Sequence, residues 1–140
     1  AVVGNGCIIG NSTKLAGEIV IDDNAILSAG VLMHQFCRVG GYTMVGGGTR
    51  FSQNIPPFTI CSREPAAYCG LNIVGLRRRG FSNELIQNIH ETYNIIMGAG
   101  GGKLAEKLAK VEQEIPMSPE IQYIIDFIKD SEKRGFVRPA

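Results

Sequence analysis

A bulky apolar residue recurs at every sixth position over the first third of the chain. The run has nine members in unbroken register, which are Val3, Ile9, Leu15, Ile21, Leu27, Met33, Val39, Val45 and Phe51. The residue after each one is small or polar, apart from one histidine, and the residue four positions on is small or β-branched. This hexapeptide pattern is typical of a parallel β-helix, in which three hexapeptides form one triangular coil. Residues 18 apart are therefore expected to stack at about 4.8 Å, with the bulky residues filling the interior.

The residue before each bulky position is expected to face away from this interior. On one face these outward residues are all apolar: Ile8, Ile26 and Met44. On the other two faces they are mixed: Lys14, Leu32 and Arg50, and Val20 and Arg38. A flat apolar stripe on a rigid prism is typical of an interface. We interpret the stripe as a contact between subunits. The alternative is that some of these side chains turn inward or that the C-terminal segment covers them.

The repeat is expected to stop at Pro56-Pro57, because proline cannot donate to a β-ladder. Charge rises beyond this point, since 11 of the 14 Lys and Arg and 10 of the 13 Asp and Glu follow Ile55. We therefore divide the chain into β-helix coils (1–57), an irregular connecting segment (58–80) and an α-helical domain (81–140). Apolar periodicity predicts three helices in that domain: 82–97 with Ser82 as N-cap, 103–115, and one from 118 that ends at Gly135.

Composition excludes several classes of protein. A formal net charge of +1 lacks the electrostatic footprint of a non-specific nucleic-acid binder. No apolar stretch approaches the roughly 18 residues of a transmembrane segment, and no signal peptide is visible, so a cytoplasmic location is expected. The four cysteines form no CxxC pair, and we interpret them as small buried thiols, with a disulfide or a zinc site as the alternative.

Breaks in the repeat are candidate functional positions. His34 stands where the other repeats have Gly, Ala, Ser or Asp, and Gln35 follows it. Gly17 lies 18 residues before Gln35, so the two are expected to stack on one face beside His34. Such a face could combine a polar side chain with an exposed backbone N–H, the kind of donor that stabilises an oxyanion. A lone histidine is more often structural, and both interpretations stay open for His34.

A second candidate is the basic triplet Arg77-Arg78-Arg79, just before the predicted helix at Ser82. Guanidinium groups near the free N–H groups of a helix start suit a phosphate or a pyrophosphate. The same patch would attract an acidic carrier protein. The alternative is a solvated basic turn.

Three segments carry a resemblance to a known family: Leu15-Ala16-Gly17, His34-Gln35-Phe36-Cys37, and the run from Asn72 to Ser82. They resemble motifs of UDP-N-acetylglucosamine O-acyltransferases, and the resemblance covers nearly the whole chain. It implies a left-handed β-helix followed by a three-helix domain. It also implies transfer of a long-chain 3-hydroxyacyl group from acyl carrier protein to the 3-hydroxyl of UDP-N-acetylglucosamine, in lipid A biosynthesis. The implied assembly is a homotrimer with no cofactor and no metal.

The same resemblance implies roles for individual residues. Gly17 would supply the backbone N–H that binds the oxyanion, and His34 and Gln35 would lie in the active-site cleft between subunits. Three further positions match residues that hold the nucleotide and its phosphates: Asn72, Arg78 and Arg79. Gly47 matches a glycine that leaves room for a long acyl tail.

The chain also departs from the family pattern. The histidine that serves as general base in the family would lie two residues upstream of Ala1, so we expect a fragment that is inactive alone. Three residues differ from those common in the family and affect the expected sugar recognition and chain-length choice: Glu18, Val74 and Pro65.

Two alternative functions stay open at this point. One is another hexapeptide acyltransferase, either the UDP-3-O-acylglucosamine N-acyltransferase or an enzyme that uses acetyl-CoA. The other is a metal-binding β-helix resembling carbonic anhydrase, which is disfavoured because His34 is the only histidine in the coils. His90 is interpreted as a surface or packing residue.

Overall fold

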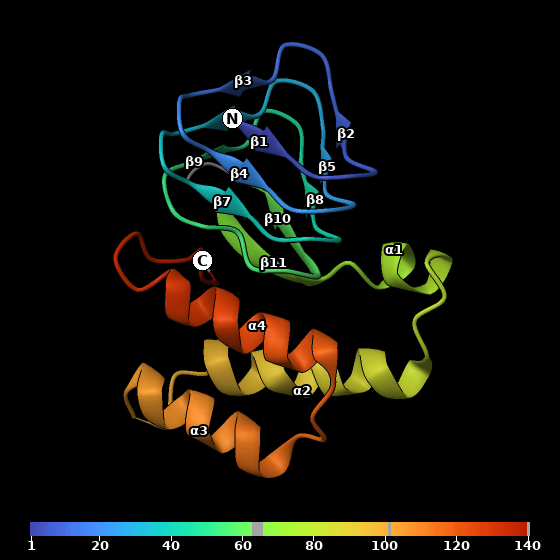
Figure 1. Ribbon diagram of the computed structural model, residues 1–140, viewed down its shortest axis with the longest axis vertical. Helices are drawn as coiled ribbons and strands as arrows, with labels where there is room; N and C mark the ends of the chain where they lie inside the picture. Colours follow the sequence, from blue (N-terminus) through green and yellow to red (C-terminus); the bar gives the residue numbers. More distant parts are fainter. Residues whose placement is uncertain (63–65, 101, 140) are drawn as a thin grey trace.

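Nine short strands form three stacked triangular coils in the computed structural model, which describes residues 1–62, 66–100 and 102–139 (Figure 1). The first coil comprises β1 (Val2–Val3), β2 (Ile8–Ile9) and β3 (Lys14–Leu15). The second comprises β4 (Val20–Ile21), β5 (Ile26–Leu27) and β6 (Leu32–Met33). The third comprises β7 (Arg38–Val39), β8 (Met44–Val45) and β9 (Arg50–Phe51).

Each strand pairs in parallel with the strand one coil away. Val2 is opposite Val20, which is opposite Arg38, so the register is the 18-residue repeat that the sequence predicts. The strands form three sheets, which we name face A (β1, β4, β7), face B (β2, β5, β8 and two later strands) and face C (β3, β6, β9). The prediction of a hexapeptide parallel β-helix is confirmed.

The core of the coils consists of the predicted inward residues. From the second coil onward the bulky position of every repeat is buried, from Ile21 to Phe51. In the first coil Val3 and Ile9 are 44% and 39% exposed, because the structure describes a neighbouring coil on one side of them only. The corners between faces contain one residue of positive φ per hexapeptide, such as Gly30 (73°) and Phe36 (67°). Glycine adopts this backbone readily, whereas a phenylalanine does not.

The segment 58–80 is not irregular, so that prediction was wrong. β10 (Thr59–Ser62) extends face B by pairing in parallel with β8, and β11 (Ala67–Leu71) pairs with β10 in antiparallel fashion. The helix α1 (Ile73–Arg78) follows. Stacking of the chain on face B also continues past the two prolines. Pro57 lies at the corner between faces A and B, directly against Gly40, and a corner residue does not need to donate a backbone hydrogen bond to a ladder.

Three predicted helices complete the chain. They are α2 (Asn83–Met97), α3 (Leu104–Glu114) and α4 (Pro119–Asp130). The hydroxyls of Ser82 and Ser118 cap α2 and α4 by accepting backbone N–H bonds at 3.1 and 3.3 Å. α4 ends at Asp130 rather than at Gly135, where the sequence had predicted its end. In the part of the chain that the structure describes, no helix has the length and apolar character to cross a bilayer.

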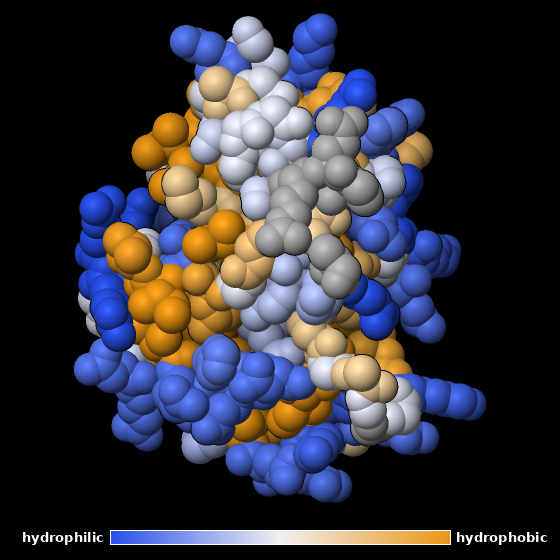
Figure 2. Space-filling model, turned by 180° about the vertical axis from the view of Figure 1, so that it is seen from behind, coloured by the Kyte–Doolittle hydropathy of each residue, from blue (hydrophilic) through white to orange (hydrophobic). Residues whose placement is uncertain are grey.

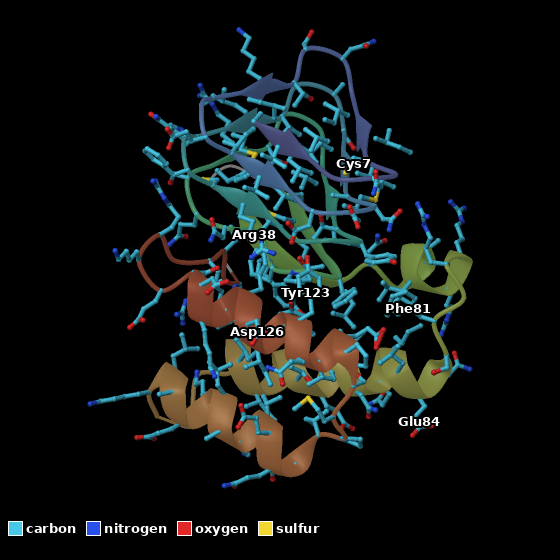
Figure 3. The ribbon with its side chains drawn as sticks, viewed as in Figure 1. Cys7, Arg38, Phe81, Glu84, Tyr123 and Asp126 are labelled. Atoms are coloured by element: carbon cyan, nitrogen blue, oxygen red, sulfur yellow. The ribbon has the colours of Figure 1, made fainter. Side chains whose placement is uncertain are left out.

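A polar contact joins the coils to α4. Asp22 on face A accepts hydrogen bonds from Arg38 at 2.8 and 3.1 Å and from the hydroxyl of Tyr123 on α4. The Tyr123 hydroxyl also accepts the backbone N–H of Gly41 at 2.8 Å, and the Arg38 guanidinium lies over the ring of Phe127. Figure 3 shows Arg38 and Tyr123 close together where face A meets α4. The contact therefore attaches α4 to face A of the coils.

Candidate functional site

The corner between faces C and A brings Gly17 and Gln35 together. The loops 16–19 and 34–37 each connect face C to face A in successive coils. A side-chain carbon at Gly17 would lie 3.9 Å from Nε2 of Gln35, so the two residues are neighbours, as their spacing predicts. The Gly17 N–H is at the surface and donates to none of the described residues. An exposed, unpaired backbone donor beside an amide side chain could bind an oxyanion.

His34 at the same corner is exposed rather than buried in the coil. Its backbone N–H continues the ladder to the carbonyl of Phe51 at 3.1 Å, while its imidazole contacts no hydrogen-bond partner among the residues that the structure describes. The Gln35 amide is likewise exposed and unpaired within that part of the chain. His34 is therefore not a core residue of the coil, and its functional role stays a prediction. Both ring nitrogens are available to a ligand.

The arginine triplet lies at the C-terminal end of α1. Arg77 and Arg78 form its last turn and Arg79 is its C-cap, so these cations are favourably placed with respect to the helix dipole. All three side chains are exposed, and none forms an ion pair or a hydrogen bond with the described residues. The free N–H groups of α1 lie at its opposite end, and the helix that the sequence analysis paired with the triplet, α2, begins at Asn83 after its N-cap Ser82. A phosphate bound at the triplet would be held by guanidinium groups without the terminus of α1, and a contribution from the start of α2 stays a prediction.

Asn72 has a structural role that the sequence analysis missed. Its side chain is 7% exposed, its Oδ1 accepts the N–H of Gly75 at 3.3 Å, and its Nδ2 donates to the carbonyl of Tyr42 at 3.1 Å. Asn72 thus caps α1 and attaches it to the corner between faces A and B. An asparagine three residues before a helical glycine N–H is a recognisable N-cap signal, but its bond to Tyr42 leaves no trace in the sequence.

Gly47 lies at the corner between faces B and C. It is exposed, and a side-chain carbon there would approach the carbonyl of Ala29 to 3.3 Å, which is a tight contact. The glycine therefore keeps this corner narrow and free of projecting side chains.

The predicted site residues do not converge within one chain. Gly17, His34 and Gln35 share the corner between faces C and A. Asn72 with the arginines and Gly47 lie at the two opposite edges of face B. Between those edges runs the predicted apolar stripe, which β10 extends by one residue: Ile8, Ile26, Met44 and Ile60. Figure 2 shows hydrophobic side chains gathered on the side of the molecule that carries β2, β8 and α1.

The remaining sequence predictions have mixed outcomes. Val74 is 63% exposed in the first turn of α1, Glu18 is exposed at a positive-φ corner, and Pro65 lies outside the described residues. Cys69 is exposed, which contradicts the expectation that all four thiols are buried, and all four are free. His90 is on the surface, as predicted. In the described ranges no group of His, Cys, Asp and Glu has the arrangement of a metal site.

Comparisons with known proteins agree with the resemblance in the motifs. Residues 54–137 match the family described as Udp N-acetylglucosamine O-acyltransferase; Domain 2. The acyl-[acyl-carrier-protein]–UDP-N-acetylglucosamine O-acyltransferase of Thiobacillus denitrificans is 41% identical over 137 residues, which are 98% of this chain and 52% of the relative. The enzyme of the same name from Pseudomonas aeruginosa is 36% identical over 138 residues, 99% of this chain and 53% of the relative.

Solved structures give the same result. A UDP-N-acetylglucosamine acyltransferase from Bacteroides fragilis superimposes with a TM-score of 0.92 at 66% identity, covering 97% of this chain and 52% of that one. The UDP-N-acetylglucosamine acyltransferase from Campylobacter jejuni superimposes with a TM-score of 0.86 at 27% identity, covering 99% of this chain and 53% of that one. The chain thus spans about half the length of the relatives it matches. By its matched residues and its fold, this chain belongs to the UDP-N-acetylglucosamine O-acyltransferase family.

Proposed function

We propose that this chain serves in an acyltransferase that moves a long-chain 3-hydroxyacyl group from acyl carrier protein to the 3-hydroxyl of UDP-N-acetylglucosamine, in lipid A biosynthesis in the cytoplasm. The proposal depends above all on one observation. In a member of this family, an exposed Gly17 N–H stands next to the side chains of His34 and Gln35, and none of the three groups has a hydrogen-bond partner among the described residues. The relatives are named for this reaction.

The chemistry assigns a part to each group. Attack of the sugar hydroxyl on the acyl thioester places negative charge on the carbonyl oxygen, and the Gly17 N–H would donate to it. A donor of this kind typically contributes about 3 kcal/mol to the transition state. His34 and Gln35 would bind the sugar, and Arg78 and Arg79 would pair with its diphosphate. The proton of the hydroxyl would go to a general base, which the resemblance places upstream of Ala1, and we expect transfer to require it. When the C–S bond of the thioester breaks, the leaving thiolate of the acyl carrier protein would take up this proton.

The division of the site between corners supports a homotrimer. In this arrangement the Gly17 corner of one copy faces face B of the next, where the arginines and Gly47 flank the apolar stripe. The stripe would then be buried, which explains why Ile8 is 59% and Met44 40% exposed in the single chain. In a cyclic assembly each site would combine two copies.

Subunit mixing tests this arrangement. In a form of the chain extended upstream by several coils, His34→Ala and an Arg78→Gln/Arg79→Gln double variant are each expected to lose most activity. Co-assembled in equal amounts, they should recover about a quarter of the wild-type activity, because a quarter of random neighbouring pairs combine two intact halves. No recovery in trimers shown to be mixed would place the whole site within one copy.

The reaction itself is tested by incubating 3-hydroxyacyl carrier protein with UDP-N-acetylglucosamine. The chain is compared with a form extended upstream by several coils. Transfer by the extended form only supports both the reaction and the upstream base. Equal activity in the chain alone would make His34 the base, whereas transfer by neither form would refute the proposed reaction.

A further inference from the structure

Next to the Gly17 corner lies a depression to which the proposed function assigns no role. It measures about 580 Å³ and is lined by Phe36, Ser52, Gln53, Asn54, Asp130, Lys133 and Arg134. Phe36 follows Gln35 in the chain, and the loop of Ser52 and Gln53 lies one coil further from Gly17. The depression therefore continues the same corner, at its end nearest to the helical domain.

Its charge is positive. Asp130 lies 3.8 Å from Arg38, which already pairs with Asp22 at 2.8 Å, so the Asp130 carboxylate offsets one of the two cations of the depression and one positive charge remains. Lys133 and Arg134 are exposed and form no ion pair with the described residues. Arg134 has one long hydrogen bond, 3.5 Å to the carbonyl of Ser52, and its guanidinium lies 5.7 Å from the centre of the Phe36 ring. Most of its five N–H donors thus remain available for an anion.

Phe36 is an unusual residue for its position. Among bulky residues at corners with positive φ, Tyr42 and Phe58 pack against each other and against Phe81. Phe36 instead leaves 53% of its side chain exposed. Smaller residues take this position elsewhere, for example Gly30 and Gly48. An exposed aromatic ring beside two free cations suits a ligand with an apolar part next to a phosphate.

We propose that this depression binds the phosphodiester of the acyl donor's prosthetic arm. The proposal rests on the proposed acyl transfer. Lys133 and Arg134 bind the phosphate, the Phe36 ring contacts the branched aliphatic carbons beside it, and the arm runs along the corner to Gly17. The carboxamide of Gln53 is placed to bind the amide groups of the arm. The arginine triplet, near face B, would bind the nucleotide.

A binding measurement tests the site without catalysis. Titration calorimetry compares free 4′-phosphopantetheine with pantetheine, which lacks the phosphate. We expect the phosphorylated compound to bind about threefold to fivefold more tightly, and this advantage to disappear in Arg134→Gln and with rising salt. Lys129→Gln, which removes a charge from α4 outside the depression, is the matched control and should keep the advantage. Equal binding of the two compounds to the unmodified protein would overturn the proposal.

Kinetics then identify the source of the phosphate. In the form extended upstream, Lys133→Gln and Arg134→Gln should each raise the KM for the acyl carrier protein about threefold to fivefold. The KM for UDP-N-acetylglucosamine and kcat should not change. The KM of Arg134→Lys for the acyl carrier protein should lie between those of the unmodified protein and Arg134→Gln. A rise only in the nucleotide KM would assign the phosphate to the nucleotide and overturn the donor assignment.

Two other results have separate meanings. Dissociation of Phe36→Ala or Arg134→Gln trimers in light scattering, with unchanged donor KM, would make the depression a contact between copies and overturn the proposal. Absence of acyl transfer in the unmodified extended form would refute the proposed function. The calorimetric comparison would still decide whether a phosphate site exists.

Discussion

Removing one hydroxyl at Tyr123 should weaken the attachment of the helical domain to the coils. In Tyr123→Phe the Asp22 carboxylate loses one donor but keeps its three hydrogen bonds from Arg38. The buried N–H of Gly41 loses its acceptor altogether. A hydrogen bond to a charged group contributes about 1.5–3 kcal/mol, and an unsatisfied buried donor costs about 1–3 kcal/mol. The ring stays packed edge-on against Phe58 and Phe127, so no cavity forms. We expect a loss of about 3 kcal/mol.

Urea unfolding followed by far-ultraviolet circular dichroism measures this loss. Tyr42→Phe is the matched control, because Tyr42 stacks on the same Phe58 while its hydroxyl contacts no partner among the described residues. The control should change the free energy of unfolding by no more than about 0.5 kcal/mol. A fall in the m-value of Tyr123→Phe would indicate that the helices separate before the coils unfold. If the two variants lose the same stability, the inferred role of the Tyr123 hydroxyl is wrong.

Three further changes test other contacts. Lys107→Met removes a buried ammonium that donates to the carbonyl of Gly98, just after α2, at 2.6 Å. The variant should lower the free energy of unfolding by about 2 kcal/mol in thermal or urea unfolding, whereas Lys110→Met, at an exposed position, should change it by almost nothing. Gly40→Ala would place a methyl group 2.4 Å from the backbone nitrogen of Pro57 and should lower the free energy of unfolding, measured in the same way, by more than about 3 kcal/mol. Gly100→Ala is the control, because a methyl group there would meet open space. Burial raises the pKa of Cys61 from 9.0 to about 12, so the folded state retains a proton that the unfolded state releases. Stability should therefore fall as the pH rises from about 9 towards 12, and fall less steeply in Cys61→Ala; identical slopes would contradict this.

The six-residue period predicted the parts of the fold that depend on stacking. It placed Val2, Val20 and Arg38 opposite one another and identified the outward stripe of face B. Serine caps located the starts of α2 and α4 correctly. The prediction that the repeat stops at the two prolines was wrong. Their inability to donate a backbone hydrogen bond matters only within a ladder, and they lie at a corner. β10 could thus resume pairing with β8 beyond them. The contact of Asp22 with Tyr123 joins residues 101 apart, and no local pattern reports it.

The candidate site was predicted where spacing alone determines contact. Gly17 and Gln35 are neighbours because each coil takes 18 residues. Asn72 was assigned to a ligand because of its motif, yet the structure engages both ends of its side chain with protein. Which corner each motif would occupy followed from the repeat for Gly17 and Gly47. It did not follow for the arginines, because the hairpin of β10 and β11 and the cap by Asn72 determine where α1 lies.

The polar groups of the chain divide into two sets, and the division indicates where ligands bind. No buried side-chain nitrogen or oxygen among the described residues lacks a partner. Asn54 shows this well, since its amide binds Ser131 and the backbone of Arg38, fastening the tail to the last coil. The Gly17 N–H and the side chains of His34, Arg78 and Lys133 have no partner in the same ranges. Because these four exposed groups make no contact that stabilises the described chain, the proposed function accounts for them as groups that bind anionic substrates.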